Sequence, residues 1–173
     1  MRAQTREMLV GALWTGVIGY ATVVVVVAVL NVLTGRSPFY TAALFGGALF
    51  YHLRDPAQVV IAAGPVLSYN MVHMVAFLAL GLFASWMVGL AERFPAAQYF
   101  ILVLLVFVAF HGFAALGFFA LPLLRGDTWW QVGVASGLAA VLMGWYLFAA
   151  HPLLRRELRD VPMGDTADDA SLG

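Results

Sequence analysis

Two histidines in long apolar stretches, His73 and His111, are the residues best suited to chemistry. Tyr69 and Asn70 precede His73 by four and three residues, so this polar cluster falls on one face of a helix. Polar and ionisable side chains inside a membrane are costly, which makes each of them a candidate functional group. Counted from the nearest prolines, His73 lies about 12 Å and His111 about 16 Å along its helix. The two imidazoles are therefore close enough in depth to face each other.

This arrangement leaves several interpretations open. Two neutral imidazoles on neighbouring helices could bind the iron of haem b from both sides. With His52 added, three histidines could form a metal site. Alternatively, His73 forms a structural hydrogen bond to Asn70 or Tyr69, or takes part in proton relay or quinone contact.

The composition narrows the classes of protein. The chain has 173 residues, of which 63% are hydrophobic and 10% charged, whereas a soluble domain carries about a quarter charged residues. This predicts a protein whose solvent is lipid. The absence of cysteine excludes thiolate metal sites and iron–sulfur clusters, and a net charge of zero argues against a nucleic-acid partner. No acidic residue interrupts the apolar stretches, so carboxylate catalysis within the membrane is not expected, and an enzyme is the less favoured interpretation.

The sequence predicts an all-α integral membrane protein with a bundle of four transmembrane helices. A helix needs about 20 apolar residues to cross the hydrocarbon core. Residues 38–51 are apolar but too few to span, so one or two short helices, interfacial or re-entrant, are expected between the first and second spans. They would form either a plain connection or a lid over a cavity. The predicted spans are 9–33, 65–90, 99–121 and 129–150, with the interfacial segment at 36–64, in a transmembrane domain of residues 9–153.

The distribution of arginine predicts the orientation. Six of the nine arginines fall on the side that holds both chain ends and three on the other side. Because cytoplasmic loops carry the excess of basic residues, residues 1–8 and the polar, disordered tail 154–173 are expected in the cytoplasm. His151 would lie at the cytoplasmic end of the last span, where a cation favours the helix dipole. The expected location is a bacterial inner membrane.

Small residues at four-residue spacing predict close helix packing. They suggest a compact bundle. A row of small residues that no helix of this chain covers could then contact a partner subunit. The leading functional hypothesis is therefore a structural or accessory subunit of a larger membrane complex or of a homo-oligomer, with the lipid bilayer and other membrane subunits as partners. The alternatives are an electron-transfer protein with b-type haem, linked to quinone, and a small channel or carrier. The packing candidates are Gly81, Ser85 and Gly89 in the second span and Gly133, Gly137 and Gly144 in the fourth.

Overall fold

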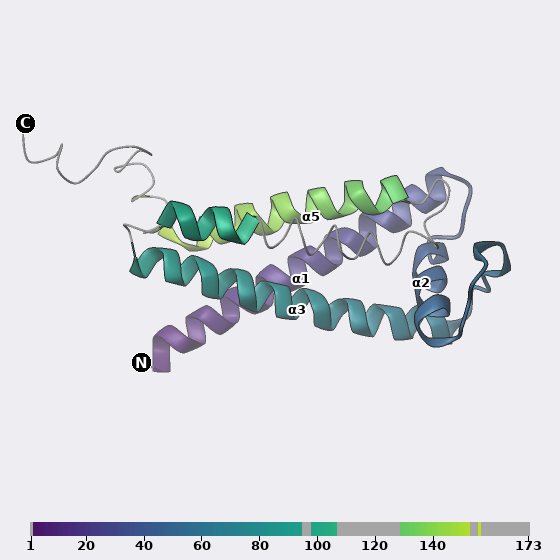
Figure 1. Ribbon diagram of the computed structural model, residues 1–173, viewed down its shortest axis with the longest axis horizontal. Helices are drawn as coiled ribbons and strands as arrows, with labels where there is room; N and C mark the ends of the chain where they lie inside the picture. The colour runs from purple at the N-terminus through teal and green to yellow at the C-terminus, as the bar shows by residue number, and fades with distance from the viewer. Residues whose placement is uncertain (1, 95–97, 107–128, 153–155, 157–173) are drawn as a thin grey trace, which may run out of the picture.

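The computed structural model describes residues 2–94, 98–106, 129–152 and 156, and these contain helices and turns but no strand. The helices are α1 (Arg2–Leu33), α2 (Tyr40–Phe50), the 3-10 turn η1 (Pro56–Gln58), α3 (Ala63–Arg93) and α5 (Trp129–Ala150), as Figure 1 shows. Residues 98–106 are also helical. The described part of the chain is therefore all-α, as predicted.

Three of these helices are long and apolar enough to cross a membrane: Leu9–Leu33, Ala63–Arg93 and Trp130–Ala150. They correspond to three of the four predicted spans. The remaining span, predicted at 99–121, is described as helix only as far as residue 106. Its remainder, which includes His111, and most of the tail 154–173 lie outside the described residues.

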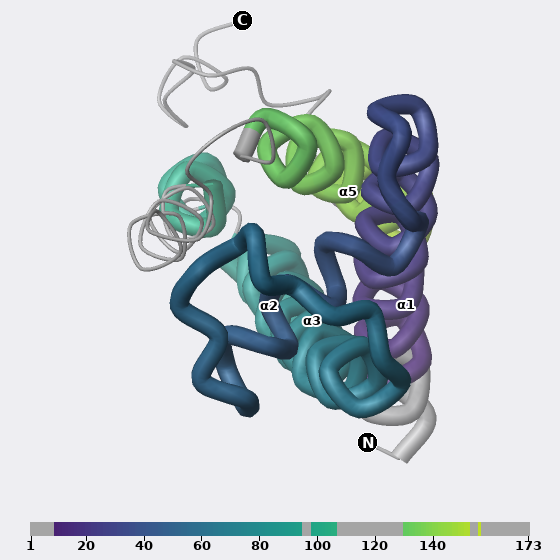
Figure 2. Tube along the Cα trace, turned by 90° about the vertical axis from the view of Figure 1, so that its right-hand side faces the viewer, coloured from purple at the N-terminus to yellow at the C-terminus, as the bar shows by residue number. Residues whose placement is uncertain are grey.

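Helix α1 is the centre of the arrangement, because it packs against both α3 and α5 (Figure 2). Along its length, the side of α1 that faces inward is small or β-branched. Val23 and Val27 are buried against Ala135 and Ala139 of α5. Val25, on the opposite side of α1, is 59% exposed, as expected of a side chain that contacts lipid.

The contact between α1 and α3 depends on two glycines. A Cβ atom added to Gly81 would lie 2.6 Å from the backbone N of Gly16, and one added to Gly16 would lie 2.7 Å from the carbonyl O of Phe77. Both distances are shorter than a van der Waals contact of about 3.5 Å. Only residues without a side chain allow the two backbones to approach this closely.

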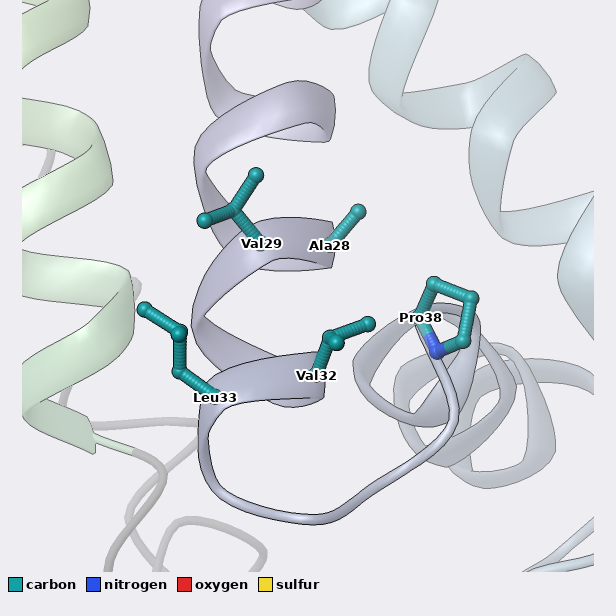
Figure 3. A pocket seen from close by; sticks show the side chains of 5 residues that line it. All are labelled: Ala28, Val29, Val32, Leu33 and Pro38. Atoms are coloured by element: carbon teal, nitrogen blue, oxygen red, sulfur yellow. The ribbon is translucent and has the colours of Figure 1, made fainter.

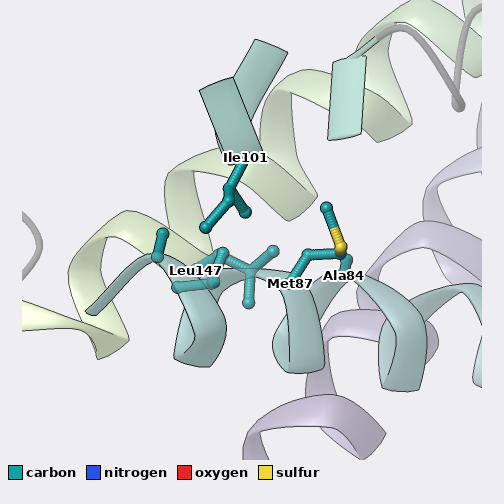
Figure 4. Packing of buried hydrophobic residues seen from close by; sticks show 6 residues of the cluster. Ala84, Met87, Ile101 and Leu147 are labelled. Atoms are coloured by element: carbon teal, nitrogen blue, oxygen red, sulfur yellow. The ribbon is translucent and has the colours of Figure 1, made fainter. Parts of the chain in front are cut away.

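A hydrophobic cluster joins α3, residues 98–106 and α5 at the end of the bundle where α3 and α5 both finish. Figure 4 shows Met87 and Ala84 of α3 facing Ile101 and Leu147. All four side chains are at most 6% exposed. This cluster is the main contact between α3 and α5, whose other contacts are few.

Helix α2 lies across the opposite end of the bundle (Figure 1) and packs mainly on α3. Leu44 is fully buried, and Gly46 is in contact with the carbonyl group of Pro65. A short helix therefore exists in the predicted interfacial segment. Eleven residues are about 16 Å of helix, so α2 cannot span the bilayer.

Two details of the interfacial segment differ from the prediction. The second expected helix is only the 3-10 turn η1, because the backbone returns to an extended conformation at Val59. The span predicted to begin at residue 65 also starts earlier, since α3 begins at Ala63 and has Gly64 in its first turn. Pro65 follows within that first turn, where its missing N–H leaves no hydrogen bond unmade.

Candidate ligand site around His73

His73 lies in the middle of a column of aromatic rings that runs from α2 along α3. The Phe45 ring of α2 stacks on Tyr69 at 5.4 Å between centroids, and Tyr69 stacks on His73 at 5.0 Å. Phe77 meets the imidazole edge-on at 4.9 Å. Tyr20 of α1 lies beside the column, 6.0 Å from His73. Phe77 follows His73 by four residues, just as Tyr69 precedes it by four. The spacing that predicted Tyr69 beside His73 therefore also places Phe77 there.

The polar members of this cluster are not bonded to His73. The Tyr20 hydroxyl donates to Oδ1 of Asn70 at 3.1 Å, and Nδ2 of Asn70 donates to the carbonyl of Val66 at 2.8 Å. Nε2 of His73 is buried and has no hydrogen-bond partner among the described residues. In the described structure neither Asn70 nor Tyr69 is a partner of Nε2: Asn70 connects α3 to α1, and Tyr69 stacks on the imidazole.

The other histidines occupy separate places. His52 is exposed in the turn after α2 and has a positive φ of 57°, and His111 lies outside the described residues. Within the described ranges, no group of three or more His, Cys, Asp or Glu side chains could hold a metal ion. The proposed triad of His52, His73 and His111 accordingly has no support in that part of the chain.

His151 makes a more specific contact than the predicted interaction with the helix dipole. Its Nδ1 lies 3.0 Å from Oε1 of Glu92, and both side chains are 20% exposed. Because Glu92 belongs to the last turn of α3 and His151 directly follows α5, the pair links two helix ends that share few other contacts. The sequence predicted only the helix-dipole interaction of His151.

A buried polar pair that sequence analysis did not single out lies beneath α2. Nδ2 of Asn31 donates to the Thr41 hydroxyl at 3.0 Å, and that hydroxyl lies 3.1 Å from Oδ1 of Asn31. Both residues are almost completely buried. Close by, Nε2 of Gln131 reaches the Thr34 hydroxyl at 3.4 Å. An Asn that directly follows the apolar run Val23–Leu30 was the available signal.

The small residues predicted to pack helices fall into two groups. Gly81 and Ser85 are buried on α3, with Gly81 against the backbone of α1. The other four are Gly89, Gly133, Gly137 and Gly144. A Cβ atom added to any of them would meet nothing within 4 Å in the described structure. The α5 stripe of Gly133, Gly137, Ala140 and Gly144 thus points away from the described helices.

One apolar recess lies at the α2 end of α1 (Figure 3). Its volume is about 260 Å³, and it is lined by Ala28, Val29, Val32, Leu33 and Pro38. It offers no polar side chain, so it has no means of orienting a polar ligand. On a lipid-facing helix, such a recess is suited to hydrocarbon chains of the bilayer.

Comparison with known proteins gives no relative: the chain matches no family model, no curated protein and no solved structure.

Proposed function

We propose that this protein is a four-span packing subunit, which associates through α5 with a larger membrane complex or with further copies of itself. The observation that carries the proposal is a stripe of small residues on α5 that no other described residue covers: Gly133, Gly137, Ala140 and Gly144. In lipid, small residues favour helix contact because they let backbones approach.

The two sides of α5 support this assignment. One side buries Ala135, Ala139, Met143 and Leu147 within the described bundle. The small-residue stripe lies on a different side of the helix, and Gly137 and Gly144 are exposed. The described bundle therefore uses one side of α5 and leaves the other available to a partner helix.

The direction of the helices supports the fourth span. Helices α3 and α5 run in the same direction (Figure 1), with Phe77 packed near Ala139 and Ala84 near Leu147. The chain leaves α3 at one end of the bundle and enters α5 at the other. A return across the bilayer within residues 94–128 would fit this arrangement, and we assign it to the predicted span 99–121.

The orientation is part of the same proposal. With four spans, both termini would lie on one side, and the six arginines predicted on that side favour a cytoplasmic location for it. The host membrane would be the inner membrane of a bacterium. Reporter fusions after Gly173 and after Ala57 should give opposite sides; signals from the same side would refute the four-span arrangement.

Association is tested with a matched pair of variants in mild detergent. Gly137→Leu should convert an oligomer or complex to the monomer, measured by native mass spectrometry, because the side chain obstructs the stripe. Gly89→Leu makes the same change at an uncovered position of α3 and should leave the assembly intact. A monomeric wild type that co-purifies with nothing, or an assembly that survives Gly137→Leu, would refute the proposal.

Haem-based electron transfer is a second candidate, favoured by one observation: among the described residues, the buried Nε2 of His73 has no partner, as expected of an axial ligand without its iron. The other predicted ligand, His111, lies outside the described residues. A visible haem absorption band that disappears in His73→Ala would support this candidate, and a colourless purified protein would eliminate it.

A further inference from the structure

We propose that His73 anchors a binding site for a quinone-class molecule, a lipid-soluble planar ring with carbonyl or hydroxyl groups. The site lies between α1, α2 and α3 and does not depend on the packing role of α5. It assigns a ligand to the one buried imidazole nitrogen that the described residues leave unpaired.

The hydrogen-bonding capacity of Nε2 defines the ligand's polar group. Buried polar atoms of native proteins almost always have a partner, and the nearby polar side chains are engaged elsewhere. Asn70 uses Oδ1 for Tyr20 and Nδ2 for Val66. As a donor, Nε2–H can bind a quinone carbonyl; in the other tautomer, Nε2 can accept from a hydroquinone hydroxyl. The same atom therefore serves both forms of the ligand.

The surrounding rings define the ligand's shape. Tyr69 and Phe77 lie within 5.0 Å of the imidazole centroid, and Tyr20 lies at 6.0 Å. Aromatic side chains pack well against a planar conjugated ring, by offset stacking or edge-to-face contact. Ligand sites of this kind combine apolar walls with a few polar groups that fix orientation.

Access from the bilayer would require the ligand to be soluble in lipid. His73 belongs to a helix that qualifies as a membrane span, and its chain neighbours Val72 and Met74 are 49% and 42% exposed. α3 has no acidic or basic residue before Glu92, so a charged ligand would find no counter-ion on this helix. Entry from the bilayer requires Tyr69 or Phe77 to rotate, because Nε2 is covered in this structure.

The experiment uses the full chain, labelled with ¹⁵N-histidine, in phosphatidylcholine nanodiscs titrated with decylubiquinone. The imidazole signal missing from His73→Phe identifies His73. We expect that signal to shift saturably with decylubiquinone and to stay in place with decane, which has a tail but no carbonyl. The signals of the other three histidines should not move.

Variants then connect the shift to binding. His73→Phe keeps an aromatic ring in the column but removes the nitrogen, and should weaken decylubiquinone binding at least tenfold in equilibrium dialysis corrected for partition into lipid. His73→Gln restores an N–H and should recover part of the affinity, which separates lost binding from lost folding. His52→Asn, at an exposed turn, should bind like the wild type.

Three results would overturn the proposal: a His73 signal that does not move, a shift that decane reproduces, or undiminished binding by His73→Phe. A haem absorption band that depends on His73 would also overturn it, because the nitrogen would then belong to iron. Since none of these measurements depends on oligomeric state, failure here leaves the proposed packing role of α5 untouched.

Discussion

Replacing Gly81 with alanine should destabilise the protein, although alanine is the better helix former. The added Cβ would lie 2.6 Å from the Gly16 N and 2.9 Å from its Cα. To restore a normal contact of about 3.5 Å, α1 and α3 must separate locally by about 1 Å. Overpacking of this kind costs about 1–3 kcal/mol, whereas the helix propensity of alanine returns at most about 1 kcal/mol. We expect a net loss of up to about 2 kcal/mol.

Gly89→Ala provides the control, because it makes the same change in the same helix at a position where no described residue lies within 4 Å of the added Cβ. It should be neutral or stabilising by up to about 1 kcal/mol. The free energy of unfolding would be measured by SDS titration in mixed micelles, followed by circular dichroism. Gly16→Ala combined with Gly81→Ala should cost less than the sum of the single changes, since the first separation accommodates the second methyl group. If Gly81→Ala is as stable as Gly89→Ala, the close crossing is refuted.

Two further predictions concern the ends of the bundle. Asn31→Leu should cost about 1–3 kcal/mol, because it leaves the buried Thr41 hydroxyl without its partner; faster hydrogen exchange in α2 would report it, and unchanged exchange would contradict it. His151→Ala should cost less than about 1 kcal/mol, since its pair with Glu92 is partly exposed to solvent. A double-mutant cycle with Glu92→Gln measures that coupling, and a larger value would show that the pair is more than a surface contact.

The spans could be predicted because a membrane helix is encoded by its own composition. The lengths of α1, α3 and α5 follow from uninterrupted apolar runs, and the shortness of residues 38–51 excluded another span. The boundaries were less accurate where helices extend past the hydrocarbon region: α3 begins at Ala63 and continues to Arg93, whereas 65–90 was predicted.

Which residues meet across helices could not be read from spacing alone. Gly81 and Gly137 look alike in the sequence, yet only Gly81 lies against another backbone in the described structure. The group around His73 was found as far as it lies on one helix, through Tyr69 and Asn70. Tyr20 and Phe45 were missed, because their places depend on how α1 and α2 pack on α3. The role of His111 stays a prediction.

The unequal lengths of the apolar helices have a consequence for how this protein responds to bilayer thickness. The apolar part of α1, Leu9–Leu33, is about 37 Å long, but that of α5, Trp130–Ala150, is only about 31 Å. In a hydrocarbon core of about 30 Å, α5 fits nearly upright, whereas α1 and the still longer α3 must tilt or extend beyond the core. The oblique course of α1 relative to α3 in Figure 1 agrees with such a tilt. A thicker membrane would draw α1 upright and turn it about its contact at Gly16, so this crossing is where lipid composition should act first.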